Sequence, residues 1–431
     1  MIIKNLQVLD SIQIPDMAEC HWDYPCPAIS NLENTLKTTL HRASLANRIK
    51  SGQRIAITAG SRGISQIATI LAILCHELKK LHAEPFIVPA MGSHGGGTLG
   101  GQIALLNSYG ITSQRLGVPI KGSERAIEIG RTAEGMPVYM DEAAFTSDGI
   151  IVVNRIKSHT SFQSTTESGI CKMLVVGLGK DQGARQIHNL GVKGLKEGIP
   201  QAARVILRNA PVLFGIGIIE NAAGGIAAIE ALAPHEIETG EARLLRRAKE
   251  LTPIIPFKQL DLLIVTEMGK DISGTGLDTN VIGRRMIAGE DEPDFPKVSR
   301  IVVLDLSENS QGNATGLGLA DIITQRLYDK IDFEKTLRNI ITSTFIERAK
   351  IPIVMPTDRS AIQLGLKTCW VLPISGARVV WIKNTYNLKS FFISPGLLSE
   401  VQQVAHLSCA SKFSLFPFDE EGSLKNVPRR F

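Results

Sequence analysis

The order strand, glycine-rich turn, helix, strand between residues 54 and 89 restricts the fold more than any other feature. A short apolar run, Arg54–Ala59, leads into the turn Gly60–Gly63, and Ile64–Leu81 then carries apolar residues at helical spacing. A second apolar run, Pro85–Pro89, closes the unit. Two strands joined in this way are expected to lie parallel in one sheet, with a right-handed crossover.

The same alternation of strands and helices continues to the end of the chain. Proline-marked residues Pro253–Lys258 (PIIPFK) interrupt it and predict a linker. The predicted fold class is α/β: two α/β domains with mostly parallel sheets and an interdomain active-site cleft. The predicted domains are residues 1–257 and residues 258–431. Further strands are expected at 149–156, 212–220, 260–266, 300–305, 351–355 and 377–383, and helices at 99–109, 199–208, 237–251, 317–330 and 358–366.

Composition excludes several classes of protein. The chain has 431 residues, 44% of them apolar and 21% charged, which is typical of a soluble globular protein with two domains. The net charge of +5, with no polybasic tail and only a modest cluster at Arg243, Arg246 and Arg247, predicts no nucleic-acid partner. The apolar runs are too short to span a membrane. The six cysteines form no CxxC pair, so disulfides and cysteine-bound metals are not expected. A cytoplasmic location is predicted.

Functional side chains follow three of the predicted strands directly. Arg62 lies in the turn after the first strand, His94 lies in the MGSHGGG loop after the second, and His159 follows the strand 149–156. Ligands of open α/β sheets bind at the carboxyl ends of strands. Two histidines there could act as general acid and base on opposite faces of one carbon. A single loop histidine, however, is more often structural or simply exposed.

Lys172 and His188 stand out in the stretch Asn154–Asn189. Lys172 precedes the apolar run MLVV, and a buried amine is costly unless it is paired, unprotonated or covalently used. Composition alone favours a lysine that extends its amine to solvent. His188 is a possible metal ligand without other protein ligands nearby. The loop Gly177–Lys180 lacks the P-loop frame but could still bind a phosphate, so a nucleotide-dependent enzyme stays open.

The segment HTSFQSTTESGICKMLVVGLGKDQGARQIHN, with GSRG and MGSHGG upstream, resembles the nickel-dependent lactate racemase family and its hydroxyacid racemase and epimerase relatives. The resemblance implies a nickel-pincer nucleotide, a pyridinium mononucleotide that holds nickel through a carbon and two sulfurs. It makes Lys172 the thioamide tether and His188, sixteen residues later, the nickel ligand. It makes His94 and His159 the acid and base catalysts, and Arg62 the ligand of the substrate carboxylate.

The resemblance extends from about residue 54 to residue 189 and has departures. The family's usual Asp-His-Thr-Arg-Pro is here Ala59–Gly63, which keeps the arginine but not the acid or the proline. In the second half, Asn280 and Arg284 occupy the loop expected to bind substrate, although Arg284 is equally plausible as a structural residue.

The predicted function is a 2-hydroxyacid racemase or epimerase that acts by transient hydride transfer. Its expected partners are a small hydroxyacid and proteins that make the cofactor. The alternatives are a nucleotide-dependent dehydrogenase or kinase, and a non-catalytic relative that binds the cofactor.

Overall fold

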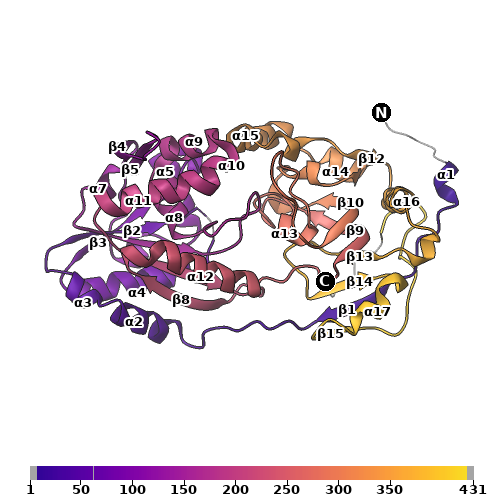
Figure 1. Ribbon diagram of the computed structural model, residues 1–431, viewed down its shortest axis with the longest axis horizontal. Coiled ribbons are helices and arrows are strands. Elements are labelled where there is room, and N and C mark those ends of the chain that lie inside the picture. Colours follow the sequence, from indigo (N-terminus) through magenta and orange to yellow (C-terminus); the bar gives the residue numbers. More distant parts are fainter. Residues whose placement is uncertain (1–6, 62, 425–431) are drawn as a thin grey trace. The chain divides into compact units, whose positions relative to one another are not determined.

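The computed structural model describes residues 7–61 and 63–424, which form two compact units (Figure 1). Cys26–Thr252 makes one unit, and the chain up to Pro25 joins the chain from Pro253 onward in the other. This division differs from the expected domains, 1–257 and 258–431, because the first strand, β1 (Ala18–Trp22), pairs with strands of the C-terminal part. None of the helices within these described residues is long and apolar enough to cross a bilayer.

The unit Cys26–Thr252 is built on a five-stranded sheet in the order β3-β2-β6-β7-β8. Neighbouring strands are parallel except for β8, which runs antiparallel to β7 at one edge. A separate hairpin joins β4 and β5. The strands are β2 (Arg54–Ala59), β3 (Glu84–Pro89), β4 (Ala126–Arg131), β5 (Pro137–Asp141), β6 (Gly149–Arg155), β7 (Val212–Glu220) and β8 (Ile226–Leu232).

Helices cover this sheet and bury their apolar sides against it. In α4 (Ile67–Lys80) the fully buried residues Ile70, Leu71, Leu74 and Leu78 repeat at helical spacing, as the sequence predicts. They belong to one hydrophobic core with residues of β2, β3, β6 and β7. The other helices outside the segment 170–209 are α2 (Leu32–Arg42), α3 (Leu45–Arg48), α5 (Leu99–Ser108), α6 (Ser113–Leu116), α7 (Glu142–Phe145) and α12 (Ile237–Glu250).

Residues 170–209 form a nearly continuous helical segment with two π-helical turns. The apolar run after Lys172 is the first of these turns, Met173–Gly177, and it is largely buried. Such turns are rare and occur frequently at functional sites. The elements are α8 (Ile170–Lys172), η2 (Met173–Gly177), α9 (Lys180–Asn189), α10 (Gly191–Lys193), η3 (Gly194–Gly198) and α11 (Ile199–Asn209).

The second unit contains an eight-stranded sheet in the order β12-β11-β10-β9-β13-β14-β1-β15. The strands from β12 to β13 are parallel, and β14, β1 and β15 extend the sheet in antiparallel fashion. The predicted α/β class with mostly parallel sheets is therefore confirmed. The strands are β9 (Gln259–Met268), β10 (Lys297–Leu306), β11 (Ile322–Thr324), β12 (Ile353–Met355), β13 (Val379–Ile382), β14 (Ser390–Ile393) and β15 (Leu407–Cys409). The helices are α1 (Gln7–Asp10), α13 (Thr279–Ile282), α14 (Gln325–Asp329), α15 (Phe333–Ser343), α16 (Asp358–Thr368) and α17 (Leu398–Val401).

Two predictions are wrong in this unit. The helix expected at 317–330 contains strand β11, because the β-branched run Ile322–Thr324 pairs with β10 and β12 before α14 begins. A disulfide, which was not expected, joins Cys20 of β1 to Cys409 of β15. These cysteines are 389 residues apart and face each other through strand pairing. Spacing along the chain could not show this.

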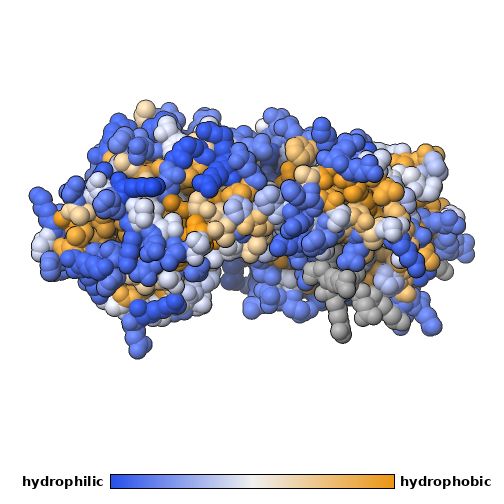
Figure 2. All heavy atoms as spheres, turned by 90° about the horizontal axis from the view of Figure 1, so that it is seen from below, coloured by the Kyte–Doolittle hydropathy of each residue, from blue (hydrophilic) through white to orange (hydrophobic). Residues whose placement is uncertain are grey.

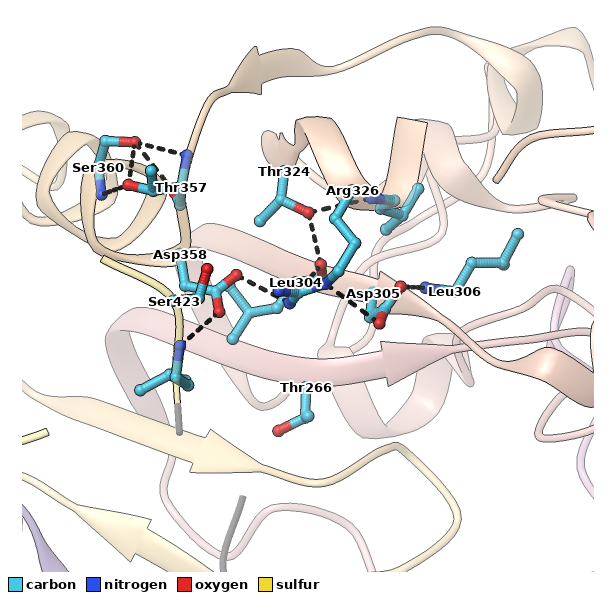
Figure 3. A network of polar contacts seen from close by, with 12 residues as sticks. Thr266, Leu304, Asp305, Leu306, Thr324, Arg326, Thr357, Asp358, Ser360 and Ser423 are labelled. Carbon is cyan, nitrogen blue, oxygen red and sulfur yellow. Dashed lines mark hydrogen bonds and ion pairs between the residues drawn. The ribbon is translucent and has the colours of Figure 1, made fainter. Parts of the chain in front are cut away.

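An ion-pair network fixes the carboxyl ends of three parallel strands in this unit (Figure 3). Arg326, just after β11, donates to Asp358 at 2.9 Å and lies 3.2 Å from Asp305 of β10. The second oxygen of Asp358 accepts the N–H of Leu424 at 2.8 Å. Each carboxylate is thus already paired, so this network joins strand ends.

On the face that Figure 2 shows, hydrophilic residues surround smaller apolar patches.

Candidate active site

The carboxyl ends of β3, β2 and β6 are neighbours in the sheet, and the predicted catalytic loops begin there. Ser61, which follows β2, forms a hydrogen bond through its hydroxyl with Nδ1 of His94, which follows β3. The Tyr109 hydroxyl donates to the carbonyl of Ser61 at 2.9 Å and holds this turn. Arg62 lies outside the described residues. No sequence pattern singles out Ser61, because its contact with His94 depends on the pairing of β2 with β3.

The buried side-chain amide of Gln102, in α5, holds the backbone of the His94 loop by hydrogen bonds. Its Nε2 donates to the carbonyls of Gly92 at 2.9 Å and of His94 at 3.3 Å. Its Oε1 accepts from Nζ of Lys180 at 2.9 Å, which fixes the orientation of the amide. Gly95 has φ +66°, and a Cβ there would lie 2.7 Å from the backbone of Gln102. The loop therefore depends on glycine and on one correctly oriented amide.

Lys180 is almost fully buried and adopts φ +55° at the start of α9. Its amine lies 3.4 Å from Asp141, whose carboxylate is fully buried. Burial lowers the pKa of Lys180, and the Asp141 carboxylate opposes that effect. A lysine held in this way cannot reach a phosphate in solvent. The Lys180 amine therefore gives no support to phosphate binding by the loop Gly177–Lys180, the alternative left open by the sequence.

His159 is held at three points after β6. Its backbone N–H donates to the buried Glu167 carboxylate at 2.6 Å, and its ring Nδ1 accepts the backbone N–H of Ser161 at 3.0 Å. Nε2 lies 2.9 Å from Nζ of Lys172. Glu167 also forms an ion pair with Lys249 of α12 at 2.6 Å. The sequence analysis did not identify Glu167, because its partners come from a loop and from a helix about 80 residues later.

Lys172 is the last residue of α8, and the start of this short helix is fixed by Glu241. The Glu241 carboxylate is almost fully buried and accepts the N–H of Cys171 at 2.8 Å. Burial raises the pKa of Glu241 to about 7, although the hydrogen bonds from Cys171 act in the opposite direction. Lys172 itself is partly buried with its amine on His159. The alternative of a lysine that simply extends to solvent is therefore not what the structure shows.

His188, in α9, is partly buried. Burial lowers the pKa of His188 to about 4, and a charge on Lys172 acts in the same direction. The imidazole is therefore neutral at pH 7, the form that binds a metal. Within residues 7–61 and 63–424, no three His, Cys, Asp or Glu side chains gather to hold a metal ion. A metal at His188 would need ligands from a non-protein group.

The π-helical turn η2 connects these parts. The N–H of Gly92 donates to the carbonyl of Gly177 at 3.2 Å, and a Cβ on Gly60 would lie 2.8 Å from Cε of Met173. The loops after β2 and β3 thus pack directly on the turn that follows Lys172. The structure brings His159 into contact with Lys172, and a charge on Lys172 lowers the pKa of His188. The His94 loop packs on the π-helical turn that follows Lys172.

Asn280 and Arg284 lie in the other unit, and neighbours within that unit hold both. Arg284 donates to Asp321 at 2.8 Å and to the carbonyl of Leu319 at 3.1 Å. It also donates to the carbonyls of Val298 and Ser299. Its guanidinium is therefore engaged in structural contacts. The Asn280 side chain donates to Asp278 at 3.3 Å and accepts from Arg285 at 3.4 Å. As substrate ligands, both residues stay predictions.

The comparison with protein-family models agrees with the resemblance noted in the sequence. Residues 19–198 match the family model of the lactate racemase N-terminal domain. Among solved structures, the lactate racemase apoprotein from Thermoanaerobacterium thermosaccharolyticum is similar, with 16% sequence identity and a TM-score of 0.49. That match covers 81% of this chain and 87% of the other. A comparison with curated proteins finds no match. The family match includes every predicted site residue except Asn280 and Arg284.

Proposed function

Because residues 19–198 match the family model of the lactate racemase N-terminal domain, we propose that this chain is a racemase or epimerase of a 2-hydroxyacid. We further propose that it uses a nickel-pincer nucleotide attached through Lys172, with His188 as the protein ligand of nickel. The chain would then depend on proteins that make this cofactor.

The contact between Lys172 and His159 is the observation that most supports this proposal. Nδ1 of His159 accepts the N–H of Ser161, which leaves Nε2 as the ring nitrogen that lies 2.9 Å from Nζ of Lys172. This contact places the amine beside the ring, and an amine in its unprotonated form is the nucleophile that a covalent attachment needs.

The donor set also fits such a cofactor. His188 offers a neutral imidazole, and the described residues supply no cluster that would hold nickel alone. A cofactor that brings its own carbon and sulfur ligands would need only one protein ligand and one anchoring amine. When bound, it would supply a reversible acceptor for the hydrogen at C2 of the substrate.

The protein would supply the proton transfers and the orientation of the substrate. One histidine would take the hydroxyl proton of the hydroxyacid and the other would return a proton after the second face is used. The Ser61 hydroxyl holds Nδ1 of His94, so we assign Nε2 as the nitrogen that exchanges the proton. The β2 turn would contribute Arg62 to bind the carboxylate, for which a guanidinium is well suited.

The proposal is tested by coexpression with a nickel-pincer cofactor pathway, followed by intact-mass analysis and nickel quantification. We expect a mass increment on Lys172, about one nickel per chain, and interconversion of the enantiomers of a 2-hydroxyacid. Lys172→Ala should lose the increment, whereas Lys193→Ala, an exposed lysine in α10, should keep it. Absence of both nickel and the increment from the wild-type protein would refute the proposal.

Two further variants test the acid and base roles. His94→Gln and His159→Gln should each abolish interconversion while nickel stays bound. Full turnover in both would refute the two-histidine scheme without affecting the assignment of Lys172.

A further inference from the structure

A cavity of about 650 Å³ lies in the unit Cys26–Thr252 and contains none of the predicted catalytic residues. It lies beside the edge strand β8, between the ends of α2 and α3 on one side and the region from Pro234 to α12 on the other. This volume is in the range of sites for small molecules. The charged side chains that line it are Arg42, Arg48, Arg247, Glu230 and Glu236, together with His235.

Both carboxylates of the lining are already engaged. Glu230 forms a two-pronged ion pair with Arg243, which lies outside the cavity lining. Glu236 accepts the N–H of Ala233 at 3.1 Å and caps the turn before α12. Neither carboxylate is ion-paired with an arginine of the lining.

The three arginines keep their positive charge. Arg48 is fixed by two carbonyls, with Nε donating to Ala43 at 3.0 Å and Nη1 donating to Leu213 at 3.2 Å, and carbonyls do not neutralise a guanidinium. The guanidinium groups of Arg42 and Arg247 form no hydrogen bond or ion pair with any residue in the described ranges, 7–61 and 63–424. The apolar residues Phe214 and Ile229 belong to the lining as well.

From these observations we infer that the cavity binds a small molecule that carries a phosphate or pyrophosphate group. Three guanidiniums around one space match a tetrahedral oxyanion of charge −2 or more, which accepts hydrogen bonds from several directions. A single carboxylate would need only one of the three. Because two hydrogen bonds already hold the Arg48 side chain in place, the ligand does not have to order it, and the entropy cost of binding is smaller.

The test is calorimetric titration of the full-length protein with pyrophosphate at a fixed ionic strength of about 0.15 M, because salt screens exposed charges. We expect saturable binding of one pyrophosphate per chain. Arg42→Gln and Arg247→Gln should each weaken binding about tenfold or more, as expected for the loss of a charged hydrogen-bond donor. Arg246→Gln is the matched control, because Arg246 is an exposed residue of the same helix that does not line the cavity.

Three results would overturn the inference. The first is no saturable binding of pyrophosphate by the wild-type protein. The second is an equal loss of affinity in Arg246→Gln, which would indicate a general effect of positive charge. The third is tighter binding of citrate than of pyrophosphate, which would favour carboxylates. Thermal unfolding of each variant is measured in parallel, and unchanged unfolding with weakened binding in Arg42→Gln and Arg247→Gln supports the inference.

Discussion

Replacing Gln102 with glutamate tests whether one amide holds the His94 loop. The two side chains have the same shape, so the contact of Oε1 with Lys180 at 2.9 Å is kept. In place of Nε2, however, a carboxylate oxygen would face the carbonyls of Gly92 and His94, which now accept at 2.9 and 3.3 Å. Two hydrogen bonds would be lost and replaced by repulsion between oxygens.

The magnitude follows from burial. A buried carbonyl that loses its donor costs about 1–3 kcal/mol, whereas a charged acceptor strengthens the bond from Lys180. The His94 contact is long and only partly buried, so we expect Gln102→Glu to lower the free energy of unfolding by about 2 kcal/mol in total. For a unit of this size that corresponds to a fall in Tm of about 4–8 °C.

Urea-induced unfolding measures the loss, and hydrogen exchange of the peptide containing residues 92–97 shows whether the loop is loosened. Gln53→Glu serves as the control, because the half-buried Gln53 side chain accepts from the backbone N–H of Lys50 and a carboxylate can do the same. Protonation would restore a donor at position 102, so the defect should be smaller at pH 5 than at pH 8. Unchanged stability and unchanged exchange in Gln102→Glu would show that this amide does not hold the loop.

Two further predictions concern Glu241 and the glycines of the His94 loop. Burial raises the pKa of Glu241 to about 7 from its ordinary value of 4.5, so the folded protein binds more protons than the unfolded chain between these pH values. Stability should therefore fall by about 3 kcal/mol as the pH rises through this window, and Glu241→Gln should remove that dependence in urea unfolding at pH 5–8; parallel profiles would contradict this. Gly95→Ala should be destabilised by at least about 2 kcal/mol more than Gly96→Ala in thermal unfolding, because only the first Cβ meets backbone. Both glycines have positive φ, so the pair separates the clash from backbone strain, and equal losses would disprove the clash.

The sequence predicts the first βαβ unit closely. Apolar runs at β2 and β3, with helical spacing between them, are local patterns, and the structure places them within three residues of the expected bounds. The sequence pattern does not predict β11, because three residues are too few to show a period. These residues form a strand because they pair with β10 and β12. The sequence pattern also fails to show that β1 lies in the sheet of the C-terminal unit.

Residue types and their spacing along the chain were enough to single out His94, His159, Lys172 and His188. Each follows a strand or lies in a helical segment whose pattern is visible locally. The contact of Lys172 with His159 depends on the tertiary structure, because it requires the loop after β6 to return onto α8. The hydrogen bonds that hold the neighbouring backbone in place also depend on the tertiary structure. Gln102, Glu167 and Glu241 are ordinary polar residues in the sequence, and only burial among partners distant in the chain makes each of them fix a backbone.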